Sequence, residues 1–544
     1  MSKYSLDTIV AWAKRKGFVY PNSEIYWWLA NAWDYGPYWS LLKKNISDLW
    51  IKTFVTSRDD MVLMDTAIIA NPQTWVASWH VGNFKDPLID DKTNGQRFRA
   101  DKIIEDWISK MYESWKYDER SWQYNYLFKF LDDIIDNSVV IDWADKETEI
   151  IKSAYEKDNY IKNDLTKFSF ACVQQEFIYN NLMKHWVNNL IPESRGNEKM
   201  HEVIINEIKN NPETGKTANW TEVRNFNMML QTQLGVTNDN SNQAYLRPET
   251  CQSLFTNFKN LCNTTRIRIP FGMAQVGKAF RNEITPGQFL YRTREFEQME
   301  IEYFVENDLE KSKEYFAMRK DLSMNFWQNI VQLKAENLKF REHEKDELSF
   351  YSAGTFDVEY LYPRGWGELQ GIANRTDYDL TQHQNISKQD LQYNDPKTWA
   401  RYIPFVIEPS FGLSRTVMAV MMDCYCEETI KEWDVRTVVK FPFDIAPIKF
   451  AVLPLVEKSE EMVDIARQLT KDLKMSGYNT EMDISGNIGK RYRRQDEIGT
   501  PYCICIDHQT LEDWAVTVRD RDTMTQATQR ILRQEIKNRN FHFE

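Results

Sequence analysis

Charged side chains flank a turn-forming sequence between residues 271 and 304. The segment Thr285-Pro286-Gly287-Gln288 contains the proline and the glycine that favour a tight turn. We therefore predict that the flanking segments 271–283 and 289–304 are the two strands of a hairpin. Side chains alternate across a strand, so every second residue of each segment lies on the same face.

One face of this hairpin joins side chains of three chemical kinds. The first strand contributes Gln275, Arg281 and Glu283, and the second contributes Arg292, Arg294, Phe296, Gln298, Glu300 and Glu302. Arginines, one aromatic ring and carboxylates in this order suit a ligand with phosphate, a flat ring and an ammonium group. The alternative is a solvated face, which is the common role of alternating charges on a hairpin.

The composition is typical of a globular protein with several domains. The chain has 544 residues, 42% hydrophobic and 27% charged, and this length predicts about three domains. The formal net charge is −12, so any nucleic-acid contact depends on local basic patches. Seven cysteines without a CxxC spacing argue against a disulfide framework or a thiolate zinc site and favour the reducing cytoplasm. Because no run of about 18 apolar residues occurs, we expect a soluble protein with no membrane partner.

The elements that must position the hairpin can be predicted from hydrophobic periodicity. Apolar residues at helical spacing predict helices over 4–16 and 39–54. From residue 95 to residue 240 the composition shifts toward Lys, Asn, Asp, Trp and Tyr, with helical patterns at 102–116 and 176–189. We expect this segment to be an insertion between two halves of one domain.

Strand patterns resume at residue 244 and include 365–371 and 402–408. The segment Phe411-Gly412-Leu413-Ser414-Arg415 then leads into an apolar helix predicted at 416–426. Glycine and serine at this junction allow backbone N–H groups and a helix N-terminus to face an anion.

Strands and helices alternate after residue 439, which predicts a compact α/β domain. The predicted strands are 448–455, 478–483, 502–506 and 515–520, and the predicted helices are 459–476, 488–497 and 525–537.

Six segments of the chain resemble the signatures of glycyl-tRNA synthetases of the dimeric class II type. They are YLRPETCQSLFTNF, FRNEITPGQFLYRTREFEQMEIE, WGELQGIANRTDYDL, YIPFVIEPSFGLSR, IGKRYRRQDEIGTPYC and LEDWAVTVRDRDT. The resemblance covers nearly the whole chain except the insertion. It implies an α+β catalytic domain, an antiparallel sheet flanked by helices, formed by residues 1–95 and 241–438. It further implies an insertion domain at 96–240 and a mixed five-stranded α/β anticodon-binding domain at 439–544.

The resemblance implies ATP-dependent activation of glycine to glycyl-adenylate, with Mg²⁺, and transfer of glycine to the 3′ end of tRNA(Gly) by a cytoplasmic homodimer. The alternative is a catalytically inactive relative that binds nucleic acid or serves as an accessory subunit. The presence of Arg281, Glu368 and Arg415 favours the enzyme.

These three residues are the implied catalytic groups. Arg281 suits the α-phosphate and the substrate carboxylate, because a guanidinium forks onto both. Arg415 suits the distal phosphates, and Glu368 could hold Mg²⁺ that bridges them, although it could instead be a strand glutamate paired with Arg375.

The resemblance also assigns two sets of ligand contacts, which overlap at Phe296 and Gly412. The implied ATP contacts are Arg281, Asn282, Glu283, Tyr291, Arg292, Thr293, Arg294, Glu295, Phe296, Glu368, Leu369, Gly412, Leu413, Ser414 and Arg415. The implied glycine contacts are Arg99, Glu249, Phe296, Glu297, Gln298, Met299, Glu300, Glu408, Pro409, Ser410, Phe411 and Gly412.

The chemistry of these side chains fits the two ligands. Phe296 offers a ring for adenine, and Glu283 could accept a hydrogen bond from the adenine amino group. The carboxylates of Glu249, Glu300 and Glu408 suit an ammonium group. Glycine has no side chain to recognise, so a crowded acidic pocket must discriminate by excluding larger amino acids.

Two further segments bear on metal and tRNA binding. Some relatives carry a CxxC pair before Arg97, but the segment 91–96 has no cysteine, so no zinc is predicted. The basic run Lys490, Arg491, Arg493 and Arg494 is a solvated helix face, a tRNA contact or structural support, and the sequence leaves these open.

Several tryptophans stand where the family has glycine: Trp27, Trp28, Trp39 and Trp79, with Trp433 as a further candidate. The largest side chain at a tight turn predicts overpacking or strain. The UGA codon is read as tryptophan in some genetic codes and as glycine in others. Our hypothesis is that these positions are UGA codons that mean glycine.

Overall fold

The computed structural model describes residues 4–26, 29–104, 106–107, 110, 196–235, 243–343 and 352–543. It divides into two compact units, one formed by Met1–Phe84 with Met228–Glu544 and one by Lys85–Asn227. Trp27, Trp28, the helix expected at 176–189 and most of the helix expected at 102–116 lie outside the described residues. None of the described helices combines the length and hydrophobicity that a membrane crossing requires.

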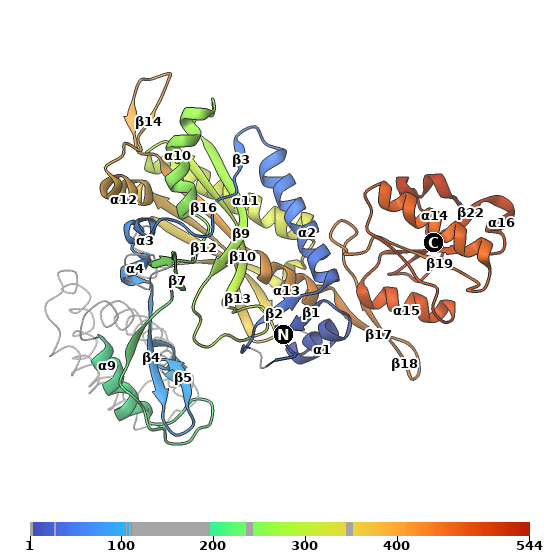
Figure 1. Cartoon of the computed structure of the whole chain (residues 1–544), viewed down its shortest axis with the longest axis horizontal. Helices are drawn as coiled ribbons and strands as arrows, with labels where there is room; N and C mark the ends of the chain where they lie inside the picture. The colour runs from blue at the N-terminus through green and yellow to red at the C-terminus, as the bar shows by residue number, and fades with distance from the viewer. Residues whose placement is uncertain are drawn as a thin grey trace, which may run out of the picture. The chain divides into compact units, whose positions relative to one another are not determined.

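The first unit contains a seven-stranded sheet with the order β11-β12-β13-β16-β10-β9-β3 (Figure 1). Its strands are β3 (Met61–Leu63), β9 (Phe271–Phe280), β10 (Glu295–Val305), β11 (Leu338–Glu342), β12 (Gly354–Tyr362), β13 (Gly365–Thr376) and β16 (Phe405–Gly412). Neighbouring strands are antiparallel except for β3 and β9, which are parallel. The predicted antiparallel sheet is confirmed.

One face of this sheet is the wall of the main hydrophobic core. On β10 the side chains of Met299, Ile301, Tyr303 and Val305 belong to this core. The helices that contribute to the same core are α1 (Leu6–Arg15), α2 (Pro37–Ile51), α11 (Leu309–Asn325) and α13 (Leu413–Cys424). Because side chains alternate, the intervening residues of β10 face the other side of the sheet. The charged series from Phe296 to Glu302 therefore lies opposite the main core.

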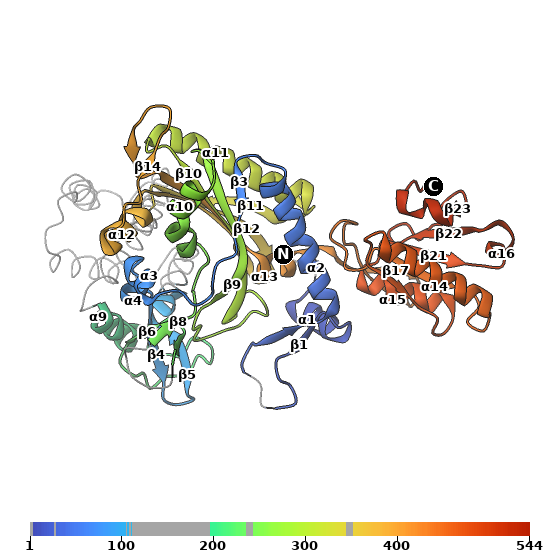
Figure 2. The same cartoon turned by 45° about the horizontal axis from the view of Figure 1, so that its top comes forward.

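Two helices cover the far end of that charged face. They are α10 (Gln252–Thr264) and α12 (Tyr378–Ser387), which lie side by side in Figures 1 and 2. Phe258 of α10 and Leu380 of α12 share a second core with Phe271 and Phe304 of the sheet. Apolar packing thus closes one end of the face and leaves its polar residues between this core and the loop at residues 281–294.

The predicted hairpin is wrong in its details. Its strands end at Phe280 and begin again at Glu295, so that residues 281–294 form a loop. Phe289 and Leu290 are both buried, with exposed fractions of 4% and 1%. Both side chains belong to the main hydrophobic core, and the chain leaves the sheet where it buries them. Arg281, Glu283, Arg292 and Arg294 are therefore loop residues rather than strand residues.

The N-terminal helices agree with the predicted positions. Helix α1 covers most of the segment expected at 4–16, and α2 continues through a π-helical turn at Lys52–Thr56. Trp39 lies inside α2, fully buried, with its ring stacked on that of Tyr35 at a centroid distance of 4.9 Å. Trp39 is therefore a helix residue and not a turn residue, because the turn ends at Gly36, the N-cap of α2.

The C-terminal part of the first unit contains a five-stranded sheet with the order β20-β19-β21-β22-β23. Its elements are β19 (Phe450–Pro454), α14 (Glu460–Met475), β20 (Thr480–Met482), α15 (Ile488–Ile498), β21 (Tyr502–Ile506), α16 (Thr510–Asp513), β22 (Ala515–Asp520) and β23 (Ile531–Leu532). Parallel pairing of β20, β19 and β21 and antiparallel pairing of β21, β22 and β23 confirm the predicted mixed α/β domain.

The helix predicted at 525–537 is wrong. The segment forms the edge strand β23 and a 3₁₀ helix at Arg533–Asn538. Arg530 binds Asp507 and Asp513, each at 2.8 Å, which fixes the start of this strand against the preceding loops. These ion pairs join residues far apart in the sequence, so local periodicity did not reveal them.

The second unit contains a three-stranded antiparallel sheet formed by β4 (Lys85–Asp91), β5 (Gln96–Arg99) and β6 (Arg224–Asn227), together with α9 (Gly196–Val203). The turn between β4 and β5 closes around buried Asp91, which accepts hydrogen bonds from the Thr93 and Asn219 amides and the Asn211 side chain. Burial would raise the pKa of Asp91, but these donors lower it to about 2.

Candidate active site

Arg281 follows the last residue of β9, at the edge of the charged face. Its Nε donates to the carbonyl of Pro248 at 3.1 Å. The guanidinium lies 5.3 Å from the ring centroid of Phe296 and 5.4 Å from that of Phe84. Contact with two rings and one carbonyl fixes the plane of the guanidinium, which suits recognition of a phosphate or a carboxylate.

The loop at residues 281–294 places an ion pair between Arg292 and Glu283 beside Arg281. The Nε of Arg292 donates to the Glu283 carboxylate at 2.5 Å, and Glu283 is only 9% exposed. The backbone N–H of Arg281 donates to the carbonyl of Arg294 at 2.9 Å, which closes the base of the loop. Arg281, Glu283, Arg292 and Arg294 are therefore brought together, although not by the strand alternation that predicted it.

Arg415 and Glu368 form a second charged pair beside Tyr291. Arg415 Nη1 lies 3.3 Å from a Glu368 carboxylate oxygen and donates to the Glu368 carbonyl at 3.1 Å. The Arg415 guanidinium also covers the Tyr291 ring at 4.4 Å and donates to its carbonyl at 3.2 Å. Burial would lower the pKa of Arg415, but Glu368 and its other neighbours raise it, so the cation is held firmly. Glu368 thus pairs with Arg415, whereas Arg375 binds other carboxylates.

Helix α13 begins at the edge of this group. Gly412 is its N-cap, and a Cβ there would meet the Arg415 side chain at 3.3 Å. Ser414 accepts from the Glu297 backbone N–H at 3.3 Å, and the Glu297 carboxylate binds Lys43 of α2 at 2.7 Å. These contacts fix the helix N-terminus against β10.

Several residues assigned to the ligands by resemblance have buried apolar side chains. Leu369, Met299, Phe411 and Leu413 belong to the main core, each at most 1% exposed. Their side chains therefore pack against the helices, and any contact they make with a ligand must use the backbone.

The carboxylates of the charged face are held in place by hydroxyl and amide donors. Glu300 is buried and accepts from Ser410 Oγ at 2.6 Å, from Gln298 Nε2 at 2.7 Å and from the Thr250 backbone N–H at 3.0 Å. Burial first, and the charge of Glu249 next, raise the pKa of Glu300. The sequence-predicted residues Gln298, Glu300 and Ser410 are therefore brought together in one hydrogen-bonded group.

Glu249 enters the same group from the segment before α10. Its carboxylate accepts from the Cys251 thiol at 2.9 Å and from Gln252 at 3.0 Å, and it lies 3.4 Å from His80 Nε2. Burial would raise the pKa of Glu249, but His80 and other neighbours hold it well below the ordinary value. His80 is itself oriented by Ser78, at 2.8 Å from Nδ1. Glu249 is the ionised carboxylate of the group.

Glu408 faces Arg375 at the other side of the group. Arg375 donates to Glu408 at 2.8 Å and to the two oxygens of Asp379 at 2.7 and 2.8 Å. Burial outweighs Arg375 and raises the pKa of Glu408 to about 8. From the sequence, Arg375 was considered only as an alternative partner of Glu368, and Asp379 was assigned no role, although their spacing of four residues could have suggested an ion pair.

Arg99 lies in the second unit, where it binds the carboxylates of Asp86 and Asp101, at 3.3 and 3.1 Å. Its predicted contact with glycine stays a prediction.

The basic run on α15 has mainly internal partners. Arg491 is buried and donates to the carbonyl of Gly486 at 2.7 Å. Arg493 binds Asp434 at 2.9 Å, and Arg494 binds Asp483 at 2.7 Å. Arg491 is therefore structural support, and Lys490, at the start of the helix, is exposed.

Comparison with known proteins gives two family matches within the chain. Residues 233–442 match the tRNA synthetase class II core domain (G, H, P, S and T), and residues 449–539 match the anticodon binding domain. A solved prolyl-tRNA synthetase from Cryptosporidium parvum aligns with 98% of this chain and 74% of its own, with a TM-score of 0.54 and 10% identity. This likeness shows the fold alone.

Relatives of similar length match nearly the whole sequence. A glycine–tRNA ligase from Lachnoclostridium phytofermentans is 46% identical over 98% of this chain and 97% of its own length. Another from Ruminiclostridium cellulolyticum is 45% identical over 96% of this chain and 95% of its own. The chain therefore belongs to the glycine–tRNA ligase family of class II aminoacyl-tRNA synthetases.

Proposed function

We propose that this chain activates glycine with ATP to form glycyl-adenylate and then transfers glycine to the 3′ end of tRNA(Gly). The observation that carries the proposal is the order of groups on one face of β10. Arg281 and Phe296 lie at one end, and the hydrogen-bonded group of Gln298, Glu300 and Ser410 follows. This order matches a substrate pair in which a nucleotide meets the carboxylate of a small amino acid.

In the first step the carboxylate of glycine attacks the α-phosphate of ATP, and pyrophosphate leaves. A carboxylate is already a nucleophile, so the protein's task is to bring two anions together and stabilise the charge that develops. Arg281 reaches the α-phosphate and the attacking carboxylate, while Arg415 binds the distal phosphates. The rings of Phe296 and Phe84 hold the guanidinium of Arg281 in a fixed plane, so little reorganisation is needed.

Glycine is held by its ammonium group. The ionised carboxylate of Glu249 supplies the negative charge, and Glu300 and Glu408 supply further acceptors. Hydrogen bonds from Thr250, Gln298 and Ser410 restrain Glu300, so the pocket cannot widen easily for a larger side chain. Specificity for glycine then follows from exclusion.

The donor set around Arg415 suits Mg²⁺ that arrives with ATP. Glu368 keeps about half of its side chain exposed, and a single carboxylate together with phosphate oxygens is a common Mg²⁺ environment. When bound, Mg²⁺ would neutralise charge on the phosphates. We propose no zinc site.

The same proposal assigns residues 1–95 and 241–438 to catalysis, 96–240 to an insertion and 439–544 to anticodon binding. The class II core match at 233–442 and the anticodon-domain match at 449–539 support this division. Resemblance to the dimeric type of the enzyme supports a cytoplasmic homodimer.

A glycine-dependent ATP–pyrophosphate exchange assay tests the first step, and charging of tRNA(Gly) tests the second. We expect exchange with glycine and none with alanine or serine. A folded protein that shows no exchange with glycine would instead be the inactive relative.

A further inference from the structure

Glu302 is a buried carboxyl group on the charged face that the proposed mechanism does not use. It is 0% exposed, and neither of its carboxyl oxygens has a hydrogen-bond partner among the described residues. An ionised carboxylate is very costly to bury in this way. The group is therefore a neutral acid with one O–H that it can donate.

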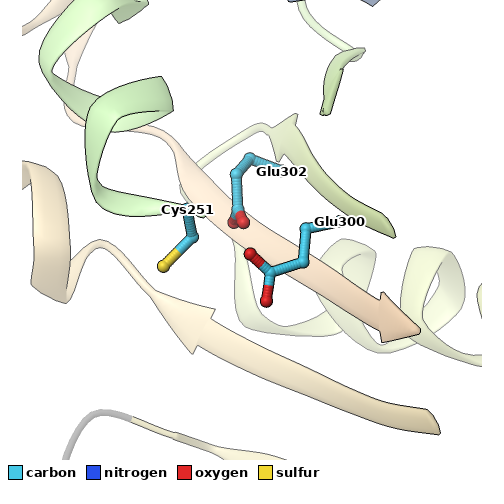
Figure 3. A group of neighbouring side chains, drawn as sticks. All are labelled: Cys251, Glu300 and Glu302. Carbon is cyan, nitrogen blue, oxygen red and sulfur yellow. The ribbon is translucent and has the colours of Figure 1, made fainter. Parts of the chain in front are cut away.

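The neighbours of Glu302 are acceptors for such a donor. The pairing of Glu300 with Ser410, and of Tyr303 with Ile407, places Glu302 opposite Glu408 across β10 and β16. One carboxyl oxygen each of Glu302 and Glu300 and the sulfur of Cys251 lie within 4.8 Å of one another (Figure 3). Glu300 and Glu408 are thus the two carboxyl groups nearest to Glu302 on this face of the sheet.

Burial and the surrounding charges favour the protonated form of Glu302. Burial has the largest effect on the pKa of Glu302, and Glu408, Glu300 and Asp379 add to it, whereas Arg375 opposes it. Together they raise this pKa well above the ordinary value. The Cys251 thiol is also buried and its pKa is raised, first by burial and then by Glu249. Burial and the neighbouring carboxylates thus favour the protonated forms of both Glu302 and Cys251.

We propose that Glu302 is a positioning residue of the glycine pocket. When glycine binds, the O–H of Glu302 donates to Glu300 or Glu408. This hydrogen bond orients the accepting carboxylate toward the substrate ammonium. The inference rests on the proposed function, because it assigns the pocket to glycine.

Three variants test this role of Glu302. E302L keeps the volume and removes the donor, E302Q keeps a donor, and E306L is a control just beyond the same strand. In the exchange assay we expect E302L to raise the KM for glycine by about tenfold, with a smaller change in kcat. We expect E302Q to restore the KM to within about threefold of the unchanged chain, and E306L to have no effect.

Two outcomes would overturn the proposal: an unchanged KM in folded E302L, or a loss in E302Q as large as that in E302L. Infrared spectroscopy gives a second measurement that does not depend on E302L folding. A protonated-carboxyl band that E302Q removes supports the neutral acid, and its absence refutes it. If the unchanged chain shows no exchange with glycine, the proposed function has failed, while the infrared result still decides the protonation state.

A different observation concerns the tryptophans. Fourteen described residues other than glycine have a positive φ, and four of them are tryptophans: Trp79, Trp399, Trp433 and Trp514, at 62°, 62°, 69° and 58°. The left-handed region disfavours bulky side chains and favours glycine. These tryptophans are also 49%, 85%, 94% and 59% exposed, although tryptophan is usually well buried.

The local structure at three of these positions is typical of glycine. Trp514 is the C-cap of α16, and Trp79 directly follows Ser78, the C-cap of α3 (Pro72–Ala77). Trp433 lies in the tight turn between β17 (Tyr425–Lys431) and β18 (Asp434–Val439). Helix ends and hairpin turns take glycine because they need the left-handed conformation. The chain as a whole has as many tryptophans as glycines, 19 of each.

We infer that Trp79, Trp399, Trp433 and Trp514 are encoded by UGA codons that the source cell reads as glycine. Trp399 and Trp514 extend the set suggested by the sequence. Trp39 does not share this backbone signature, because it lies inside α2.

The codons and the peptides of the natural protein decide this inference. We expect UGA at the four positions, UGG at the buried Trp50 and Trp75, and glycine in peptides from the source cells. UGG codons at the four positions, or tryptophan in those peptides, would overturn it. As an independent measurement, W433G and W514G should raise the Tm, and the control W50G should lower it, since Trp50 is fully buried. A lower Tm in both W433G and W514G would contradict the inference that the backbone at these positions favours glycine.

Discussion

Arg375 donates a hydrogen bond of 2.8 Å to Glu408 and holds Asp379 with its other nitrogens. All three side chains are nearly buried, with exposures of 5% for Arg375, 12% for Glu408 and 2% for Asp379. The guanidinium thus lies where a strand of the sheet and α12 bring two carboxylates together. Its positive charge offsets part of the negative charge of the acidic group formed by Glu249, Glu300 and Glu408.

Replacing Arg375 with methionine should therefore destabilise the protein strongly. Removal of one partner from a buried ion pair typically costs about 3–5 kcal/mol, because the remaining charge is left without compensation. Urea unfolding monitored by circular dichroism measures the change. R401M is the matched control, because Arg401 pairs with Asp390 on the surface and exposed pairs contribute only about 0–1 kcal/mol. Equal effects of the two substitutions would contradict the buried role of Arg375.

Glu408 should make stability depend on pH. Burial raises its pKa from 4.5 to about 8 in the folded protein, so the folded state binds a proton that the unfolded state has lost. The stabilisation from this group is fully present below pH 4.5 and is lost as the pH rises toward 8. E408Q, which can still accept from Arg375, should reduce the fall in Tm between pH 6 and 8. An unchanged slope would show that Glu408 does not titrate in this range.

The resemblance implied the antiparallel character of the sheet, and alternation gave the shared face of β10. Neither gave the loop at 281–294 or the hydrogen-bond partners of the buried acids. Alternation placed Phe296, Gln298, Glu300 and Glu302 on one face correctly, because the rule depends only on neighbouring residues along one strand. The loop at 281–294 depends on where Phe289 and Leu290 find a core, which is a tertiary property.

The acidic pocket shows the same limit. Resemblance assigned Glu249, Glu300 and Glu408 to glycine, and the structure brings them together with donors from separate elements. Arg375 and Glu302 were not assigned to this acidic group. The ion pair of Arg375 with Glu408 and the lack of a hydrogen-bond partner for Glu302 are visible only when β10, β13 and β16 are placed side by side. Sequence periodicity describes which face a residue occupies, but not what it meets there.

Substitution of lysine for Arg281 should impair activation although it keeps the charge. Lysine cannot fork onto the phosphate and the carboxylate together, and it loses the planar contact with Phe296. We expect kcat for glycine-dependent exchange to fall by about 100-fold or more, with an unchanged Tm. K278R, which keeps a cation beside Glu295, is the control for a charge near the start of β10. A kcat for R281K close to that of the unchanged chain would remove Arg281 from the reacting atoms.

Glu368 should affect the use of Mg²⁺ rather than of glycine. E368Q keeps the size of the side chain and weakens a carboxylate ligand, so we expect a higher Mg²⁺ concentration for half-maximal exchange. The KM for glycine should stay within about twofold, because the carboxylate binds Arg415 and not the acidic group. Titration of Mg²⁺ at fixed ATP measures the first effect. A changed KM for glycine with unchanged Mg²⁺ dependence would reverse this assignment.

The basic run on α15 should divide into structural and tRNA-contacting residues. Arg491 is buried and bonded to backbone carbonyls, so R491A should lower the Tm. Lys490 is exposed at the start of the helix, and K490A should leave the Tm and the exchange reaction unchanged. If Lys490 contacts a tRNA phosphate, K490A raises the KM for tRNA(Gly) by several-fold at low salt, and the effect diminishes as salt is added, because the phosphate contact is electrostatic. Charging kinetics at two salt concentrations separate this contact from a solvated lysine, for which the KM would not change at either concentration.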